Sequence, residues 1–210
     1  IKVMSFGFIS GNDTPVIWRG PLVSRMTEQF FRDVEWGTLD ILVLDLPPGT
    51  GDIQLTLTQK LKMTGAIIVT TPQDIALADV RKGADMFKKV NTPVLGVVEN
   101  MSGLHLTGET NATNANIIIN GSKVAVDDYG NFQLNIDLFK TGGGDKESKR
   151  LGVPLLGKIP ISKTLMEATD MGEPLIVYDD KHEISKIYMN MTNQILSIVD
   201  KPNLDKDPKS

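Results

Sequence analysis

The sequence predicts an α/β fold, namely a mostly parallel sheet flanked by helices, with an inserted β-hairpin. Short apolar runs bounded by turn-forming residues indicate buried strands at residues 41–44, 66–70 and 94–98. Segments with helical spacing of apolar residues alternate with these runs, which is typical of βαβ units with right-handed crossovers. A polar stretch at about 104–140 interrupts the pattern and contains two alternating runs, which predict the hairpin.

The length, charge and apolar content of the sequence narrow the class of protein. The 210 residues, 40% of them hydrophobic, suffice for one core, and we expect a single α/β domain over 1–199 followed by a disordered tail over 200–210. A net charge of −4 gives no electrostatic footprint for nucleic acid. No apolar run approaches the ~20 residues that span a bilayer, and the N-terminus lacks a signal-peptide pattern, so we expect a cytoplasmic protein without membrane contacts.

The first part of the chain is expected to contain a strand, a helix and a second strand. Lys2–Ile9 alternates loosely between apolar and polar residues, which predicts a strand. Pro21 suits the first turn of a helix, where its missing N–H costs nothing, and an apolar stripe at helical spacing runs from Leu22 to Val34. The run at 41–44 then predicts a strand that is buried on both faces.

Two βαβ units follow this strand. A helix over 54–62 leads to the strand at 66–70, which ends in a turn with Asp74 as the expected N-cap of an amphipathic helix over 75–90. The next strand is expected to close in a turn at Glu99–Ser102.

The inserted segment is expected to pair with itself. Its alternating runs lie at 122–126 and 132–138, and Asp127–Asn131 between them is typical of a hairpin loop. Gly142–Gly144 closes the excursion. These glycines resemble a phosphate cradle, but no Lys-Ser/Thr pair follows, so we interpret them as a flexible joint.

The C-terminal part is expected to form three helices and a fourth core strand. The helix over 145–151 ends at Gly152, and the strand at 154–158 ends in a turn over 159–162. A short helix follows over 163–171. Residues 182–199 follow the i, i+3, i+4, i+7 rule closely, which predicts a helix packed on the sheet.

Candidate site residues gather after the run at 41–44. Asp45 ends this run, and a Pro-Pro-Gly-Thr-Gly turn with Gly49 leads to a second carboxylate, Asp52. A carboxylate at the carboxyl end of a parallel strand stands where open α/β sheets bind ligands, and in P-loop proteins it helps to hold Mg²⁺. Glycines let backbone N–H groups approach a phosphate. The alternative is a buried strand before an ordinary turn.

Six separated segments share their residues with one protein family. They are VIWRGPLVS (16–24), LDILVLDLPPGTGDIQLTL (39–57), GAIIVTTPQDIALADVRKG (65–83), VNTPVLGVVENMS (90–102), FKTGGG (139–144) and LGVPLLGKIPIS (151–162). Together they resemble the Mrp/ApbC-type iron–sulfur cluster carrier ATPases, within the MinD/ParA group of P-loop NTPases. The resemblance covers most of residues 1–178 apart from the hairpin segment. It implies a MinD-like fold, ATP and Mg²⁺ as cofactors, an iron–sulfur cluster, and a homodimer with client or assembly proteins.

The resemblance also implies roles for particular residues near the phosphates. Asp45 matches the Walker B aspartate, which acts on Mg²⁺ through a water molecule. Gly49 matches the switch glycine whose backbone N–H senses the γ-phosphate. Asp52 lies in the same switch loop and is expected to help order it, so Asp45 and Asp52 are the catalytic candidates.

Other matching residues are implied to lie near the base. Asn100 matches the asparagine that hydrogen-bonds the adenine, and Pro160 matches a residue that lines the base pocket. Thr71 and Gln73 are further candidates near the nucleotide. Plain turn formation is the alternative interpretation of Asn100 and Pro160.

Two family features are missing from these residues. The glycine-rich Walker A loop, G-K-G-G-x-G-K-[ST], is absent, and we expect it upstream of residue 1 in a longer protein, together with a central strand. The C-x-x-C motif that follows the Asn-Met-Ser turn is also absent, because the hairpin segment stands there and the chain has no cysteine. Iron–sulfur clusters are held chiefly by cysteine thiolates, so cluster binding is implied by kinship only.

Three functions therefore remain open at this point. The first is an ATP-binding and ATP-hydrolysing iron–sulfur cluster carrier or assembly factor, with hydrolysis implied by the family and not by these residues alone. The second is a non-hydrolytic binding or scaffold protein derived from the same fold. The third is a ParA/MinD-like positioning ATPase, which the lack of a basic patch and of a membrane-targeting helix disfavours.

Overall fold

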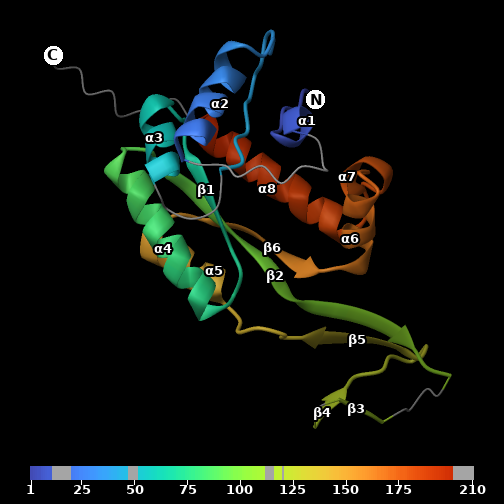
Figure 1. The fold of residues 1–210 in the computed structure, drawn as a ribbon. Coiled ribbons are helices and arrows are strands. Elements are labelled where there is room, and N and C mark those ends of the chain that lie inside the picture. Colours follow the sequence, from blue (N-terminus) through green and yellow to red (C-terminus); the bar gives the residue numbers. More distant parts are fainter. Residues whose placement is uncertain (11–19, 47–51, 112–115, 120, 201–210) are drawn as a thin grey trace.

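A parallel sheet forms the centre of the molecule in the computed structural model, which describes residues 1–10, 20–46, 52–111, 116–119 and 121–200. Strand β2 (Val94–Glu109) lies between β1 (Ala66–Thr70) and β6 (Leu155–Ile161) and runs parallel to both (Figure 1). The predicted fold class, a mostly parallel α/β sheet flanked by helices, is confirmed.

Helices cover both faces of this sheet. Val97 of β2 packs in a core with Ala84 and Phe87 of α4 (Asp74–Lys89). The next residue, Val98, packs with Met191 of α8 (Glu183–Val199). Successive residues of a strand point to opposite faces, so α4 and α8 lie on opposite sides of the sheet. These two apolar layers hold β2 in place.

Further helices pack around these layers. Among the described residues they are α1 (Gly7–Ser10), α2 (Gly20–Arg32), α3 (Asp52–Lys60), α5 (Gly143–Leu151), α6 (Lys163–Asp170) and α7 (Leu175–Tyr178). The expected helices at 54–62, 75–90, 145–151, 163–171 and 182–199 are confirmed with small shifts of their ends, whereas α7 was not predicted. None of the described helices is long and apolar enough to cross a bilayer.

The inserted segment forms an arm that leads away from the helices (Figure 1), and we refer to residues 103–141 as the arm. The outer half of β2 pairs antiparallel with β5 (Asn131–Ile136), while β3 (Ile117–Ile119) pairs with β4 (Ser122–Val124). The register gives the arm one apolar and one polar face. The apolar cross-strand pairs are Leu104–Ile136, Leu106–Leu134 and Gly108–Phe132.

The predicted self-pairing of the insertion was largely wrong. Residues 132–136 pair with β2 and not with 122–126, and only an isolated bridge between Val126 and Phe132 joins the two predicted runs. The reason is that β2 does not end at Glu99–Ser102. Met101 adopts a positive φ of 53°, which bends the strand without ending it, so β2 offers a longer ladder.

The expected loop at Asp127–Asn131 does form. The Asp127 Oδ1 atom accepts hydrogen bonds from the backbone N–H groups of Tyr129 and Asn131. Gly130 has a φ of 87°, and a Cβ atom on it would lie 2.1 Å from the backbone oxygen of Thr110. Only glycine fits this position, so Gly130 is required for the loop to adopt this conformation.

Two predicted strands are absent from the described structure. Residues 2–6 are irregular and α1 begins at Gly7. Residues 41–44 have no regular structure, and Val43 is 85% exposed. A strand requires a hydrogen-bonded neighbour, and within the described residues neither segment is paired with one. Strand β1 is covered on one face only within the described residues, since Ile67 and Val69 are exposed.

Two further local predictions were wrong. Gln73 and not Asp74 occupies the N-cap of α4, and Asp74 is the first helical residue, which forms an ion pair with Lys140. The fourth core strand continues to Ile161, so Pro160 lies within β6 and not in a turn.

Candidate nucleotide site at the carboxyl edge of the sheet

Thr71, Asn100 and Pro160 lie side by side where the continuous parallel pairing of β2 with β1 and β6 ends. The register pairs Thr70 with Glu99 and Asn100 with Ile159. Thr71 and Pro160 each follow a paired residue, so they flank Asn100 on the neighbouring strands. This edge is where open α/β sheets bind ligands.

Asn100 presents a donor group at this edge. Its Oδ1 atom accepts a hydrogen bond of 2.9 Å from the backbone N–H of Met101. This contact orients the amide, and no acceptor contacts its Nδ2 group within the described part of the chain. A primary amide with a free NH₂ group and a second lone pair on oxygen matches the hydrogen-bonding edge of adenine.

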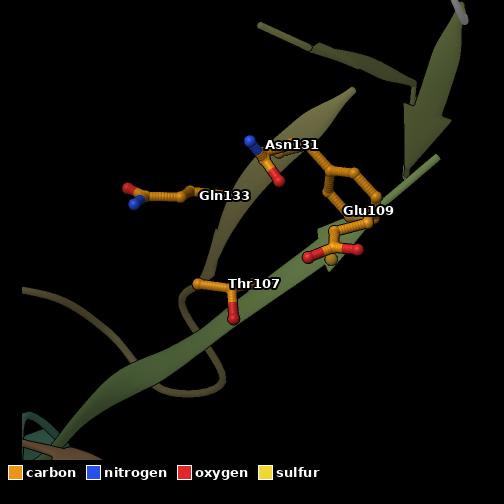
Figure 2. A pocket seen from close by; sticks show the side chains of 6 residues that line it. Thr107, Glu109, Asn131 and Gln133 are labelled. Carbon is orange, nitrogen blue, oxygen red and sulfur yellow. The ribbon is translucent and has the colours of Figure 1, made fainter. Parts of the chain in front are cut away.

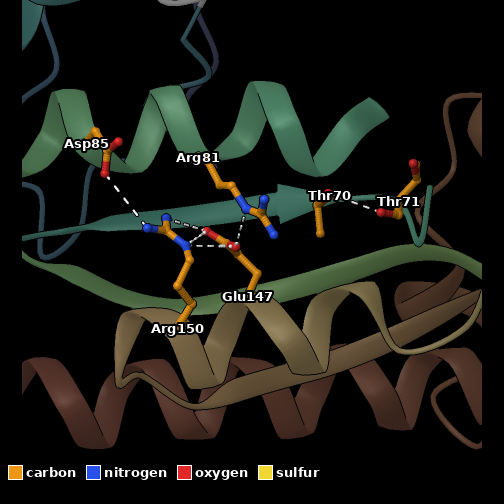
Figure 3. Close-up of polar contacts among 6 residues, drawn as sticks. All are labelled: Thr70, Thr71, Arg81, Asp85, Glu147 and Arg150. Carbon is orange, nitrogen blue, oxygen red and sulfur yellow. Dashed lines mark hydrogen bonds and ion pairs between the residues drawn. The ribbon is translucent and has the colours of Figure 1, made fainter. Parts of the chain in front are cut away.

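Thr71 and Gln73 lie between the end of β1 and the start of α4. Thr71 follows β1, and its Oγ1 atom is buried without a hydrogen-bond partner among the described residues. Its backbone oxygen accepts a hydrogen bond of 3.1 Å from the Thr70 hydroxyl (Figure 3). Gln73 caps α4 without a side-chain hydrogen bond to the helix. Pro160 is buried and contributes an apolar wall. An unpaired buried hydroxyl is costly, so a polar ligand at Thr71 would be favourable.

The phosphate side of the expected site is described only in part. Asp45 lies in an exposed irregular segment and not at the end of a strand, contrary to the expectation. Gly49 lies outside the described residues. Asp52 is the first residue of α3, and its side chain is likewise outside the described part. The phosphate side of the site therefore stays a prediction, because only Asp45 and the backbone of Asp52 belong to the described residues.

The described residues do not assemble a magnesium site. Within them, no group of three or more His, Cys, Asp or Glu side chains is placed to hold a metal ion. Mg²⁺ requires near-octahedral oxygen ligands, several of them from water and phosphates. No chemical step is therefore assigned to this ion.

Sequence reasoning missed Glu99, which was taken as part of a turn. Glu99 lies in β2 and is 1% exposed, with its carboxylate directed at the start of α5. A hydrogen bond from Lys158 to Asp145 raises the pKa of the Lys158 ammonium, and Coulomb attraction to Asp145 and Glu99 adds to this shift. The sequence signal that could have pointed to Glu99 is its position directly after the apolar run VLGVV.

A separate shallow hollow lies on the polar face of the arm. Its lining includes Thr107, Glu109, Asn131 and Gln133 (Figure 2). These residues belong to β2 and β5, away from the carboxyl edge with Asn100. The hollow offers one carboxylate and neutral polar groups, so it is not part of the candidate site.

Two solved structures share the fold of this chain. The cell division ATPase MinD of Pyrococcus furiosus superposes with a TM-score of 0.54 at 18% identity, covering 86% of this chain and 59% of that chain, and this likeness shows the fold alone. A nucleotide-binding protein of Archaeoglobus fulgidus, solved in complex with ADP, matches with a TM-score of 0.52 at 34% identity, covering 72% of this chain and 53% of that one. The fold is thus that of a MinD-like P-loop NTPase.

Sequence comparison places the chain more closely. A ParA-group model described as NUBPL iron-transfer P-loop NTPase matches residues 1–131 and 106–196. The iron–sulfur cluster carrier protein of Pseudomonas fragi is 42% identical over 191 residues, which is 91% of this chain and 58% of the relative. The iron–sulfur cluster transfer protein NUBPL of Dictyostelium discoideum is 39% identical over 207 residues, or 99% of this chain and 57% of the relative.

The chain belongs to this family of iron-transfer P-loop NTPases. The resemblance drawn from the six sequence segments is confirmed. The chain spans less than three fifths of the length of both relatives.

Proposed function

We propose that this protein binds ATP at the carboxyl edge of β1, β2 and β6 and acts as a carrier or assembly factor for iron–sulfur clusters. The supporting observation is the placement of Asn100 between Thr71 and Pro160 on neighbouring parallel strands. Family membership gives this arrangement its context, since relatives at 42% and 39% identity bear carrier and transfer names.

Asn100 would select the base in this proposal. Its Nδ2 group donates to a ring nitrogen of adenine, and its Oδ1 atom accepts from the exocyclic amino group. Guanine presents a carbonyl oxygen and an N–H group on its corresponding edge, so the same amide orientation fits it less well. Pro160 would pack against the base, and the Thr71 hydroxyl would gain a polar partner.

The phosphate side of the proposal rests on family kinship. Asp45 would hold Mg²⁺ through water, Gly49 would sense the γ-phosphate and Asp52 would help to order their loop. Such an arrangement supports ATP hydrolysis by positioning and charge stabilisation. Homodimerisation and a cytoplasmic location belong to the same proposal and rest on the same kinship.

The iron–sulfur cluster enters as cargo. The 210 residues contain no cysteine, so none of them supplies a thiolate ligand. Client or assembly proteins are the proposed source and destination of the cluster.

Base selection tests the proposal directly. In the full-length protein, Asn100→Ala should weaken ATP binding about tenfold, as the loss of one or two hydrogen bonds predicts, and should reduce the preference for ATP over GTP. Asn135→Ala, at an exposed asparagine on the arm, is the matched control and should bind both nucleotides normally. Equal ATP binding by all three proteins would contradict the proposed site.

A second candidate function is a non-hydrolytic scaffold. The exposed, irregular setting of Asp45 favours it, because a Walker B aspartate is expected at the end of a buried strand. Asp45→Ala in the full-length protein separates the two. Loss of Mg²⁺-dependent hydrolysis supports the ATPase, whereas a wild-type protein that binds ATP without turnover supports the scaffold.

A further inference from the structure

The buried carboxylate of Glu99 contacts both ends of the arm. Its Oε1 atom accepts a hydrogen bond of 2.5 Å from the Ser102 hydroxyl, just before the arm begins. Its Oε2 atom accepts a hydrogen bond of 2.6 Å from the backbone N–H of Gly144, just after the arm returns. One side chain thus joins two chain positions that are 42 residues apart, since 144 − 102 = 42.

The local structure at Gly144 fits this contact. A Cβ atom at Gly144 would lie 2.8 Å from Glu99 Cβ and 3.1 Å from Glu99 Oε2, so only glycine allows the approach. Gly144 is in the first turn of α5, where free backbone N–H groups and the helix dipole favour an anion. Gly144, the last of the three glycines that resemble a phosphate cradle, therefore binds the protein's own carboxylate.

The other ties at this joint are exposed. Lys140 pairs with Asp74, and the hydrogen bond from Lys140 holds the pKa of Asp74 below its usual value. Lys158 bonds to Asp145 at 2.6 Å, with both side chains more than two fifths exposed. Exposed ion pairs contribute little. Glu99 is thus the buried tie that fixes the joint, which is more constrained than the flexible joint expected from sequence.

Glu99 also directly precedes Asn100. The Glu99–Ser102 contact spans Asn100 and Met101. Within this span, the N–H of Met101, which has a positive φ, donates a hydrogen bond to the side-chain oxygen of Asn100. Any shift of the Glu99 carboxylate would therefore release this bend and the orientation of the amide.

We propose that Glu99 is a positioning residue that ties both ends of the arm to the bend carrying Asn100 and so holds Asn100 for a nucleotide base. This role rests on the proposed ATP binding. It also predicts that the residues where the arm joins the sheet become less ordered when the Glu99 carboxylate is removed, whether or not nucleotide is present.

The test compares Glu99→Gln with Glu99→Ala in the full-length protein. Glutamine keeps both hydrogen bonds, because its Oε1 atom accepts from Gly144 and its Nε2 group donates to the Ser102 oxygen. Alanine loses both. The ligands are ATP and inorganic tripolyphosphate, which shares the phosphates but lacks the base.

We expect Glu99→Ala to bind ATP about tenfold more weakly, as the loss of oriented hydrogen bonds predicts, with unchanged tripolyphosphate binding. Glu99→Gln should stay within about threefold of wild type for both ligands. Ser102→Ala, which removes one of the two contacts, should show an intermediate loss of ATP affinity. It replaces Glu99→Ala in the test if that variant does not fold. Amide exchange at Gly144 should accelerate in Glu99→Ala without nucleotide.

Ile184→Ala is the matched control for a general loss of stability. Ile184 is buried in a separate core with Ala168 and Leu175. It should lower the thermal midpoint while leaving the ratio of ATP to tripolyphosphate affinity unchanged. Unaltered ATP binding by Glu99→Ala, or an equal change of that ratio in Ile184→Ala, would overturn the inference. A wild-type protein that binds tripolyphosphate but not ATP would instead refute the proposed base site, and the positioning role with it.

Discussion

The buried glutamate Glu147 should be less costly to remove than its arginine partner. The Glu147 side chain is 1% exposed and lies between Arg150, with hydrogen bonds of 2.5–3.0 Å, and Arg81, with one of 3.4 Å (Figure 3). Arg81 and Arg150 are 52% and 37% exposed. The two cations can therefore turn to water when Glu147 is absent, whereas the carboxylate has no such route when Arg150 is absent.

The magnitudes follow from this asymmetry. Arg150→Ala leaves a buried carboxylate with one long contact and should lower the free energy of unfolding by about 3–5 kcal/mol. Glu147→Ala removes charge-assisted hydrogen bonds but leaves hydrated arginines, and should cost about 2 kcal/mol. Arg81→Ala should cost about 1 kcal/mol or less, since its contact is long and half exposed.

Urea unfolding of the full-length protein, followed by circular dichroism, measures these differences. Lys82→Ala breaks an exposed pair with Asp79 and provides the control, with an expected change within about 0.5 kcal/mol. If Glu147→Ala proves as destabilising as Arg150→Ala, the reasoning from solvent access is wrong.

Two further predictions concern the cap of α6 and the loop of the arm. Ser162 caps α6 by accepting a hydrogen bond from the Leu165 N–H, so Ser162→Ala should lower the free energy of unfolding by about 1 kcal/mol in the same urea assay, and Ser162→Asp should restore most of it. The hydrogen bonds from Asn131 hold the pKa of Asp127 below its usual 3.8. The ionised carboxylate therefore stabilises the loop fully above pH 3.8. This stabilisation is lost as the pH falls through the lowered pKa of the folded protein. As the pH is lowered below about 4, the protection of the Tyr129 amide against hydrogen exchange, relative to intrinsic rates, should decrease. Asp127→Asn should abolish this pH dependence. Protection in the wild type that stays constant down to about pH 2 would contradict the prediction.

Elements with strong local signals could be predicted from the sequence. The helical apolar spacing over 182–199 depends on nothing beyond the segment itself, and α8 forms as expected. Gly152 ends α5 in the left-handed conformation for an equally local reason. The strand 66–70 was also placed correctly, because β2 provides its partner.

Strand pairing could not be predicted, because it depends on distant segments. The run at 41–44 has the composition of a buried strand but no paired neighbour within the described residues. Residues 132–136 pair with β2 and not with the nearer 122–126, because β2 continues past Met101, which has a positive φ. No local pattern distinguishes a bend from a stop at that position.

The candidate site was predictable only where sequence position and strand register coincide. Thr71 follows β1, and Asn100 and Pro160 lie at adjacent register positions of β2 and β6, so the correct placement of the parallel strands brought them together. Glu99 was missed because its two partners are Ser102 and Gly144, and the second contact closes only after the whole arm has returned.

The central claim is that the carboxyl edge of the sheet holds an adenine base against Asn100. A crystal structure of the full-length protein with Mg²⁺ and a non-hydrolysable ATP analogue tests it most directly. The account predicts an adenine ring nitrogen within about 3.2 Å of Asn100 Nδ2, with Pro160 against the ring. A nucleotide bound elsewhere, with Asn100 in contact with protein atoms only, would contradict the account.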